Sequence, residues 1–317
     1  MFRKLLRVAM GVMLAGALAW PAAAWNFHSH MSIGCVAYQN LKPRTRARVN
    51  QLLRLNPYYP KWEAMIPAGS SPADKDLMIF MIATTWPDQL RNDPEYHDDG
   101  PQGGNRPGGP EASQNIGYAD HLRHKYWHFV DLPFSQDGTA LPETPAPNAQ
   151  TQIAAFRAAL GSSASDDVKS YDLTWLLHIV GDVHQPLHCT TRVRQGQPHG
   201  DAGGNSVKVC APECTWTLHW YWDSPQGANN APIAEVIAAS KALPPAPKKV
   251  ARIRKESVWV AEGFRLAQQV VYVAPVGPEG GPYTLDASYE AAARALTLRQ
   301  VALAGARLAN LLNRELK

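Results

Sequence analysis

The chain carries the segment Tyr171-Asp-Leu-Thr-Trp-Leu-Leu-His178-Ile-Val-Gly-Asp182-Val183 near its middle. The spacing of its apolar residues predicts a helix over 171–183, with Ser170 as the expected cap. Residues four apart share a helix face, so His178 and Asp182 project together. Their neighbours are Leu, Ile, Val and Trp, among which an uncompensated carboxylate is costly to desolvate. The segment therefore predicts a buried helix that carries an imidazole and a carboxylate on one face.

Two further signals lie downstream of this helix. His188 follows Asp182 by six residues, and Pro186 between them ends or bends the helix, which turns His188 back toward the same pocket. His219 and Asp223 repeat the spacing of four. One such pair alone is best explained as a surface or core histidine beside an acid, but two pairs favour a metal site. Imidazole nitrogen together with carboxylate oxygen suits Zn²⁺ better than Ca²⁺ or Mg²⁺.

The rest of the chain is predominantly helical by the same periodicity. We expect helices at residues 32–55, 75–86, 151–160, 171–183, 258–273 and 288–316. Two long irregular segments rich in Pro, Gly and acids, at 92–115 and 132–150, separate them. Residues 206–209 predict a small β-hairpin beside the Gly-Gly-Asn turn at 203–205. The fold class expected is mainly α, as one multi-helix domain with a small β-hairpin.

The N-terminal 24 residues have the pattern of a secretory signal peptide. Basic residues are followed by an apolar run over 8–20 and by Ala22-Ala23-Ala24. A membrane anchor is the alternative, but the apolar run is too short to span the hydrocarbon comfortably. We expect cleavage before Trp25, one domain over 25–317, and a periplasmic or secreted protein with no membrane anchor after cleavage.

Charge and cysteine content add limits on function. The chain has 31 Lys and Arg residues and 27 Asp and Glu residues. Three of the basic residues lie in the expected signal peptide, so the mature chain would have about as many basic as acidic residues. Net charge therefore gives no support for nucleic-acid binding, and any attraction for a polyanion must come from a local patch or from bound metal. Cys35, Cys189, Cys210 and Cys214 permit three disulfide pairings, and a short turn could join the last two.

Several motifs occur in the order typical of one enzyme family. They are Trp25, His30, Trp86-Pro87-Asp88, Trp127-His128-Phe129, His178-x3-Asp182-x5-His188, Gly203-Gly204-Asn205 and His219-x3-Asp223. The chain thus resembles the S1/P1 nucleases, which share the phospholipase C/P1 nuclease-like fold. Two features depart from that pattern: Pro87 stands where a small residue is common, and His28 is a second imidazole close to His30. The spacing favours His30.

The resemblance implies three zinc ions. The first would be held by Asp88, His128, His178 and Asp182, and the second by His188, His219 and Asp223. The third would be held by the α-amino nitrogen and carbonyl oxygen of Trp25, with His30 and Asp182. The remaining histidines would be packing or solvated groups, namely His184 behind the helix and His97, His121, His124 and His199 in loops.

The resemblance also implies the reaction and its substrate. Asp131 would orient the attacking water, and Arg91 would stabilise charge on the phosphate. A base would stack on Phe129, with Ala202 facing the ring and Asn205 offering its amide to the base edge. The expected activity is endonucleolytic cleavage of single-stranded DNA and RNA to 5′-phosphorylated products, with 3′-nucleotidase activity as a further possibility of the family.

Two alternatives remain open at this stage. A zinc phospholipase C has a similar fold and metal site, but its second zinc typically uses Glu where this chain has Asp223, and the Gly-Gly-Asn stretch is a nuclease feature. The other is a secreted zinc-binding protein without catalytic activity, against which Asp131 and Arg91 argue. The expected oligomeric state is a monomer.

Overall fold

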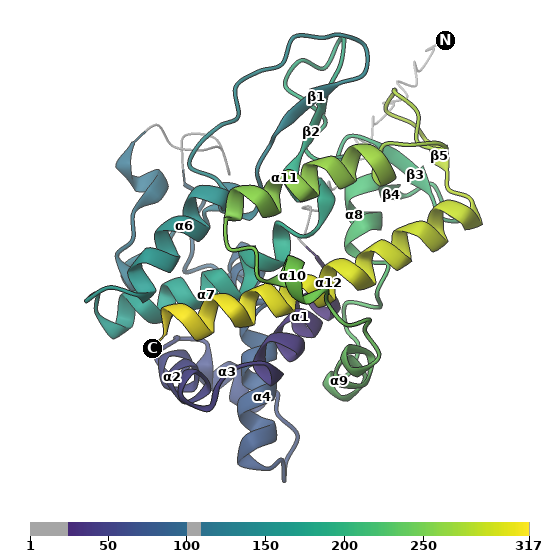
Figure 1. Cartoon of the computed structure of the whole chain (residues 1–317). Coiled ribbons are helices and arrows are strands. Elements are labelled where there is room, and N and C mark those ends of the chain that lie inside the picture. The colour runs from purple at the N-terminus through teal and green to yellow at the C-terminus, as the bar shows by residue number, and fades with distance from the viewer. Residues whose placement is uncertain (1–24, 100–108, 317) are drawn as a thin grey trace, which may run out of the picture.

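The computed structural model describes residues 25–99 and 109–316 (Figure 1). The expected signal peptide, residues 1–24, lies outside the described residues. Helices dominate the described part and the sheets are small, so the mainly α fold class is confirmed. None of the helices described there is both long enough and apolar enough to cross a membrane.

The helices follow one another along the whole chain. The α-helices are α1 (Phe27–Gln39), α2 (Pro43–Leu53), α3 (Tyr59–Ala64), α4 (Pro72–Ala83), α5 (Trp86–Gln89), α6 (Ala149–Leu160), α7 (Asp166–Asp182), α8 (Leu218–Asp223), α9 (Ile233–Lys241), α10 (Lys248–Ala251), α11 (Glu256–Leu266) and α12 (Ala287–Glu315). Short 3-10 segments are η1 (Leu90–Asn92), η2 (Pro110–Ser113), η3 (Gly117–Ala119), η4 (Lys125–His128) and η5 (Pro186–Cys189), and η6 (Ala267–Val271) is a π-turn.

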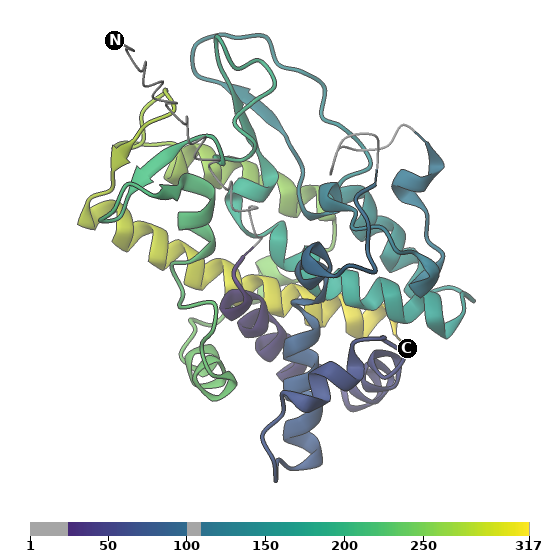
Figure 2. The ribbon, with the colours of Figure 1, turned by 180° about the vertical axis from the view of Figure 1, so that it is seen from behind.

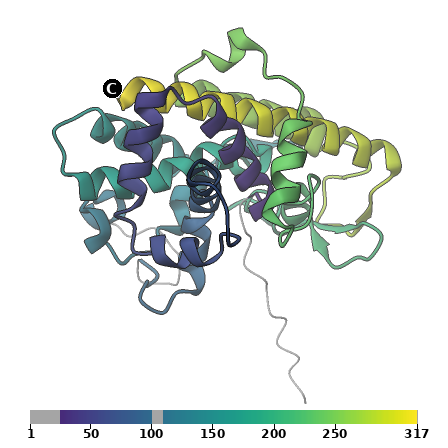
Figure 3. The same ribbon diagram turned by 90° about the horizontal axis from the view of Figure 1, so that it is seen from below.

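Helix α7 lies in the middle of the fold. It packs against α1, α2, α5, α6 and α12, and α12 runs beside it across the molecule toward the C-terminus (Figures 1 and 2). Helix α1 contacts α4, α9 and α12, an arrangement that is clearest from below (Figure 3). Every residue of α7 from Ser170 to Asp182 is buried. A helix buried on all sides carries apolar residues on all its faces, and the few polar side chains among them must be hydrogen-bonded or bound to a metal.

Helix α7 begins earlier than the apolar pattern predicts. Its cap is Ser165, whose hydroxyl accepts a hydrogen bond from the backbone N–H of Val168, and Asp166 and Asp167 add negative charge to the first turn. The predicted cap Ser170 is wrong: it lies inside the helix, where its hydroxyl donates to the Leu52 carbonyl at 2.6 Å. The first turn is polar and exposed, so apolar spacing did not detect it.

Two other predicted helices are divided in the structure. The single helix expected over 32–55 is α1 followed by α2, because Pro43 has no N–H to continue α1 and instead occupies the first turn of α2. The helix expected over 258–273 is α11 followed by the π-turn η6. The helices expected near 151–160 and 288–316 are α6 and α12, within two residues at each end.

The strands are short and form two small sheets. β1 (Pro133–Ser135) pairs in parallel with β2 (Thr191–Val193), while β3 (Lys208–Cys210) pairs with β4 (Trp216–Thr217) and β5 (Tyr283–Thr284). A hairpin does form at β3, but its turn is residues 211–215 and not the Gly-Gly-Asn segment. A disulfide joins Cys210 to Cys214 across that turn, and Cys35 and Cys189 are buried free thiols.

Candidate metal centre

Residues far apart in the sequence meet at one end of α7. They are Trp25, His30 on α1, Asp88 on α5, His128 at the end of η4, His178 and Asp182 on α7, His188 on η5, and His219 and Asp223 on α8. All nine are buried. The helical segments bring the side chains in from different directions, so the sequence-predicted ligands do converge.

The first group consists of Asp88, His128, His178 and Asp182. The Nε2 atom of His178 lies 3.2 Å from Oδ2 of Asp182 and 3.0 Å from Nδ1 of His128. The same His128 nitrogen lies 3.1 Å from Asp182 Oδ2, and Asp88 Oδ1 lies 3.8 Å from His178 Nε2. Donor atoms of all four side chains thus face one point, as the four ligands of a tetrahedral ion would.

The second group consists of His188, His219 and Asp223. The two Nε2 atoms are 3.2 Å apart, and His219 Nε2 lies 3.6 Å from Asp223 Oδ2. Two nitrogens on one tetrahedral zinc would be about 3.3 Å apart at the usual bond length. Three protein ligands around such a point leave a position for water or substrate.

Backbone carbonyls orient three of these imidazoles. Each uses Nδ1 as the donor: His178 to the carbonyl of Thr84 at 2.7 Å, His188 to that of His128 at 2.8 Å, and His219 to that of Gly203 at 2.8 Å. A ring that donates from Nδ1 keeps the Nε2 lone pair for a cation. The Nε2 lone pairs of two neutral rings, His188 and His219, would therefore face each other at 3.2 Å, a repulsive contact that a cation shared between them relieves.

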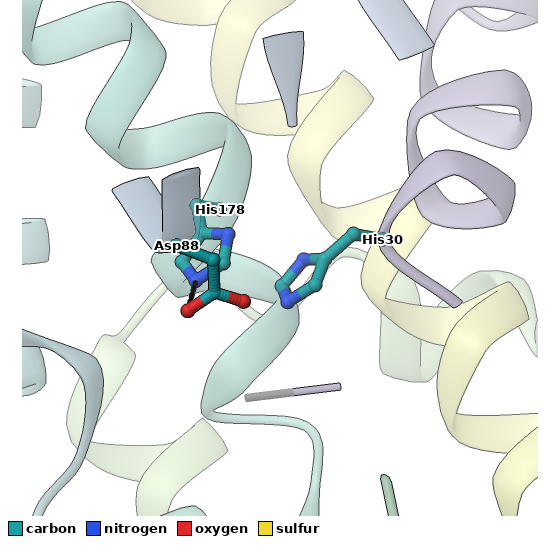
Figure 4. A group of neighbouring side chains, drawn as sticks. All are labelled: His30, Asp88 and His178. Carbon is teal, nitrogen blue, oxygen red and sulfur yellow. Dashed lines mark ion pairs between the residues drawn. The ribbon is translucent and has the colours of Figure 1, made fainter. Parts of the chain in front are cut away.

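His30 and Trp25 lie beside the first group. The His30 ring stacks on His178 with centroids 3.9 Å apart, and its Nε2 lies 3.3 Å from Asp182 Oδ1. Figure 4 shows His30, Asp88 and His178 converging from separate elements. The Trp25 indole donates to the Gly181 carbonyl at 2.9 Å. The N-terminal end of the described segment is thus fixed next to Asp182.

Two glycines make these close approaches possible. A Cβ at Gly181 would lie 3.1 Å from Nδ1 of His30, so the absence of a side chain lets α1 place its imidazole against α7. A Cβ at Gly203 would lie 2.4 Å from the Leu187 carbonyl oxygen, and the φ of +60° at Gly203 is one that residues with a side chain rarely adopt. The Gly203 carbonyl is the acceptor that orients His219.

The electrostatics of the cluster fit a bound cation. Burial, followed by the neighbouring His188, lowers the pKa of His219 to about 3, which keeps its ring neutral and able to coordinate. Burial raises the pKa of the Asp223 carboxyl well above its ordinary value. Oδ1 of Asp182, Oδ2 of Asp223 and Oδ2 of Asp88 have no hydrogen-bond partner among the described residues. Buried carboxylates of this kind are stable as anions when a metal compensates them.

The side chain of Gln185 orients the Asp223 carboxylate. Its side-chain nitrogen donates to Oδ1 of Asp223 at 2.8 Å, which leaves Oδ2 directed at His219. Replacing Gln185 by leucine is expected to lower zinc affinity at the second group about 10- to 100-fold, because the carboxylate loses the contact that orients it. Competition titration with a fluorescent chelator measures this. The control is Gln300→Leu, which removes another buried glutamine that bonds to the His184 carbonyl; equal affinities in both variants would contradict the role of Gln185.

A cavity of about 230 Å³ opens beside both groups. Its wall contains all five predicted catalytic and substrate-binding residues, namely Arg91, Asp131, Phe129, Ala202 and Asn205. Lys125 and ligand residues of both groups also line it. Arg91 is ion-paired with Asp88 at 3.1 Å. The Asn205 amide nitrogen donates to the Ala202 carbonyl at 2.8 Å, so its hydrogen-bonding capacity is partly used within the loop.

Among the four histidines expected in solvated loops, one is buried instead. His97, His121 and His199 are exposed as expected, but His124 is fully buried between Asp99 and Asp120, with each ring nitrogen within 2.9 Å of a carboxylate oxygen. The solvated role expected for His124 is therefore wrong. One acidic partner, Asp120, lies four residues before it in the chain, and the other, Asp99, lies 25 residues before it, so the sequence did not show that the two carboxylates enclose the ring.

Two other histidines, His28 and His184, lie near the predicted ligands but belong to none of the groups of possible metal ligands among the described residues. His184 donates to the Val180 carbonyl at 2.7 Å and receives a hydrogen bond from Arg307 at 3.0 Å, which agrees with the expected packing role. His28 packs its ring against Gly227. Between the two N-terminal imidazoles, the structure places His30 with the ligands.

The fold and this site define a mainly α protein with a buried His/Asp centre able to hold metal ions. A family model described as S1/P1 Nuclease matches residues 25–317, so the chain belongs to the S1/P1 nuclease family. This family is zinc-dependent, and membership implies a hydrolase with nucleic acid as its substrate. No individual curated protein matches the chain.

Proposed function

We propose that this protein is a three-zinc endonuclease that cleaves single-stranded DNA and RNA to 5′-phosphorylated products. The supporting observation is the convergence of the buried His/Asp groups on one cavity whose wall also carries Arg91, Asp131 and Phe129. An activity on 3′-nucleotides is a second reaction of the same site. The functional unit is the single domain over 25–317, released to the periplasm or the medium after removal of residues 1–24, and acting as a monomer.

The proposed ligand sets follow the groups described above. Asp88, His128, His178 and Asp182 would hold one zinc, and His188, His219 and Asp223 a second. Trp25, through its α-amine and carbonyl oxygen, would hold a third with His30 and Asp182. The bound ions supply the positive charge that neutralises phosphate oxygens and favours hydroxide over water as the nucleophile.

The other residues of the cavity bind, orient and move protons. The Asp131 carboxylate accepts a hydrogen bond from the attacking water and aligns it with phosphorus. The Arg91 guanidinium, held by Asp88, donates to a phosphate oxygen as negative charge develops in the transition state. Both Asp131 and Arg91 line the cavity. Each of the two roles requires only that one polar atom of the side chain reaches the water or the phosphate.

Substrate choice depends on Phe129. Its half-buried ring faces the cavity, next in sequence to His128, so a base stacked on it would bring the adjoining phosphate toward the first group. Stacking tolerates every base but requires one that is free of its duplex partner. The exposed Ala202 leaves room opposite the ring, and Asn205 offers its remaining amide oxygen to the base edge.

The deciding experiment uses protein processed to Trp25 and loaded with zinc. Single-stranded DNA is expected to be cut about tenfold or more faster than the same sequence as a duplex, because freeing a paired base costs a few kcal/mol. A chelator should abolish cleavage, and added zinc should restore it. Mass spectrometry of the products should find 5′-phosphates. Hydrolysis of phosphatidylcholine in place of DNA would identify a phospholipase C, and bound zinc without hydrolysis of either substrate would identify a non-catalytic protein.

A further inference from the structure

Lys125 lines the same cavity as Phe129 and Asp131 and is not accounted for by the ligand sets or the catalytic residues. It is the first residue of η4, the segment that ends at His128. Its side chain is 32% exposed, so part of it is open to solvent at the cavity wall. A cation placed there is available to an anionic ligand.

The backbone before Lys125 is held in an unusual conformation. His124 has a φ of +41°, in the left-handed region that residues with a side chain rarely adopt. Asp99 and Asp120 bind its two ring nitrogens at 2.9 and 2.8 Å, and the ring stacks on Trp127 with centroids 3.5 Å apart. These contacts keep η4 in place, so the start of the Lys125 side chain has a fixed position relative to Phe129.

The charges around Lys125 leave it partly uncompensated. Its ammonium lies 2.7 Å from Oδ1 of Asp98, and the same oxygen lies 3.3 Å from the guanidinium of Arg123. One carboxylate thus serves two cations. Asp98 belongs to no metal group, whereas Arg91, the other cation of the cavity, is paired with the candidate ligand Asp88. The carboxylate that pairs with Lys125 is therefore not one of the candidate metal ligands, unlike the one that pairs with Arg91.

We propose that Lys125 binds a backbone phosphate of single-stranded nucleic acid, adjacent to the nucleotide whose base lies on Phe129 and distinct from the phosphate that is cleaved. This inference rests on the proposed function. Lysine binds phosphate as a point charge and carries no base information. Lys125 should therefore favour longer strands over single nucleotides without selecting a sequence.

The test measures strand binding directly, without cleavage. Zinc-loaded protein processed to Trp25 is titrated into a fluorescein-labelled oligothymidylate with phosphorothioate linkages, and anisotropy is recorded across a range of NaCl concentrations. Lys125→Gln should weaken binding about tenfold at low salt, since the strand loses one charged hydrogen bond. The slope of log affinity against log salt should become shallower by about 0.7, the contribution of one phosphate contact. Lys125→Arg should restore most of the affinity and the slope.

The matched control is Lys75→Gln on α4. Lys75 is also an ion-paired lysine, with Glu63 at 2.5 Å, but it does not line the cavity. This variant should bind the strand as the unchanged protein does. Steady-state cleavage of an ordinary oligonucleotide should show a larger change in KM than in kcat for Lys125→Gln, as expected for a residue that binds the strand away from the reacting phosphate.

The outcomes separate this inference from the proposed function. If the unchanged protein binds and cleaves the strand, but Lys125→Gln has the same affinity and salt slope, the role of Lys125 is wrong and the nuclease assignment stands. If the strand binds through Lys125 but no phosphodiester is cleaved, the nuclease assignment fails and the binding site stands. A protein that binds no strand at all contradicts both.

Discussion

Replacing Asp182 by asparagine is expected to abolish nuclease activity and to release more than one zinc ion. The two oxygens of this carboxylate face different partners: Oδ1 lies 3.3 Å from His30, while Oδ2 lies 3.1 Å from His128 and 3.2 Å from His178. Asparagine removes the negative charge and offers only one oxygen. Loss of metal charge stabilisation worth several kcal/mol corresponds to a rate decrease of about a thousandfold or more.

Two measurements check this expectation. Zinc content is determined by mass spectrometry of the processed protein, and the rate of single-strand cleavage is measured with zinc in excess. Asp172→Asn is the matched control, because Asp172 is a fully buried aspartate on the same helix whose side chain bonds to Asn115 at 2.9 Å. Burial raises the pKa of Asp172 to about 7, so an uncharged amide suits its surroundings. An Asp182→Asn protein that keeps its full zinc content and its activity would overturn the bridging role.

A chain that retains one alanine before Trp25 is expected to bind one zinc fewer and to lose most of its activity. The added residue converts the α-amine into a peptide nitrogen, which has no lone pair for a metal. The buried surroundings leave little room for rearrangement, because the Trp25 indole is bonded to Gly181 and the Asn26 N–H donates to the Asp223 carbonyl at 3.1 Å. With one of three ions lost, we expect a rate decrease of about a hundredfold or more.

The control for this experiment has a different leader peptide but is cleaved to the same Trp25 end. It should bind three zinc ions and cleave single-stranded DNA at the normal rate. N-terminal sequencing verifies both proteins, and thermal unfolding checks that the extended chain is folded. If the extended chain is folded and carries three zinc ions, the α-amine is not a ligand and the third site needs another donor.

The helical periodicity and the spacing of four residues were strong signals because both are local. His178 and Asp182 share one face of α7 whatever the rest of the chain does, and α8 does the same for His219 and Asp223. His188 also had a local signal, because Pro186 ends the helix between it and Asp182. The other ligands had none. Asp88 and His128 were assigned through the resemblance to a family, since nothing in their own segments indicated which distant residues they would meet.

The sequence interpretation was wrong, or gave no indication, where the role of a residue depends on tertiary contacts. The sequence predicts His124 in solvent, but its ring lies between Asp99, 25 residues before it, and Asp120, four residues before it. Lys125 belongs to no sequence motif, but it lines the cavity. Nothing in the sequence distinguishes Gln185, which lies between the ligands Asp182 and His188, but its side chain orients the carboxylate of Asp223. None of these roles depends on periodicity, so periodicity could not reveal them.

The amino-acid sequence by itself determined that the chain is mainly helical, that one helix carries His178 and Asp182 on one face, and that His219 and Asp223 repeat the same spacing, because helix formation and side-chain direction depend on neighbours within a few residues. Only the tertiary structure decided that these pairs meet His30, Asp88, His128 and His188 in adjoining buried groups. That convergence depends on how α1, α5, α7 and α8 pack, and on Gly181 and Gly203 permitting the approach. Packing joins residues without regard to their distance along the chain, and local sequence carries no record of it.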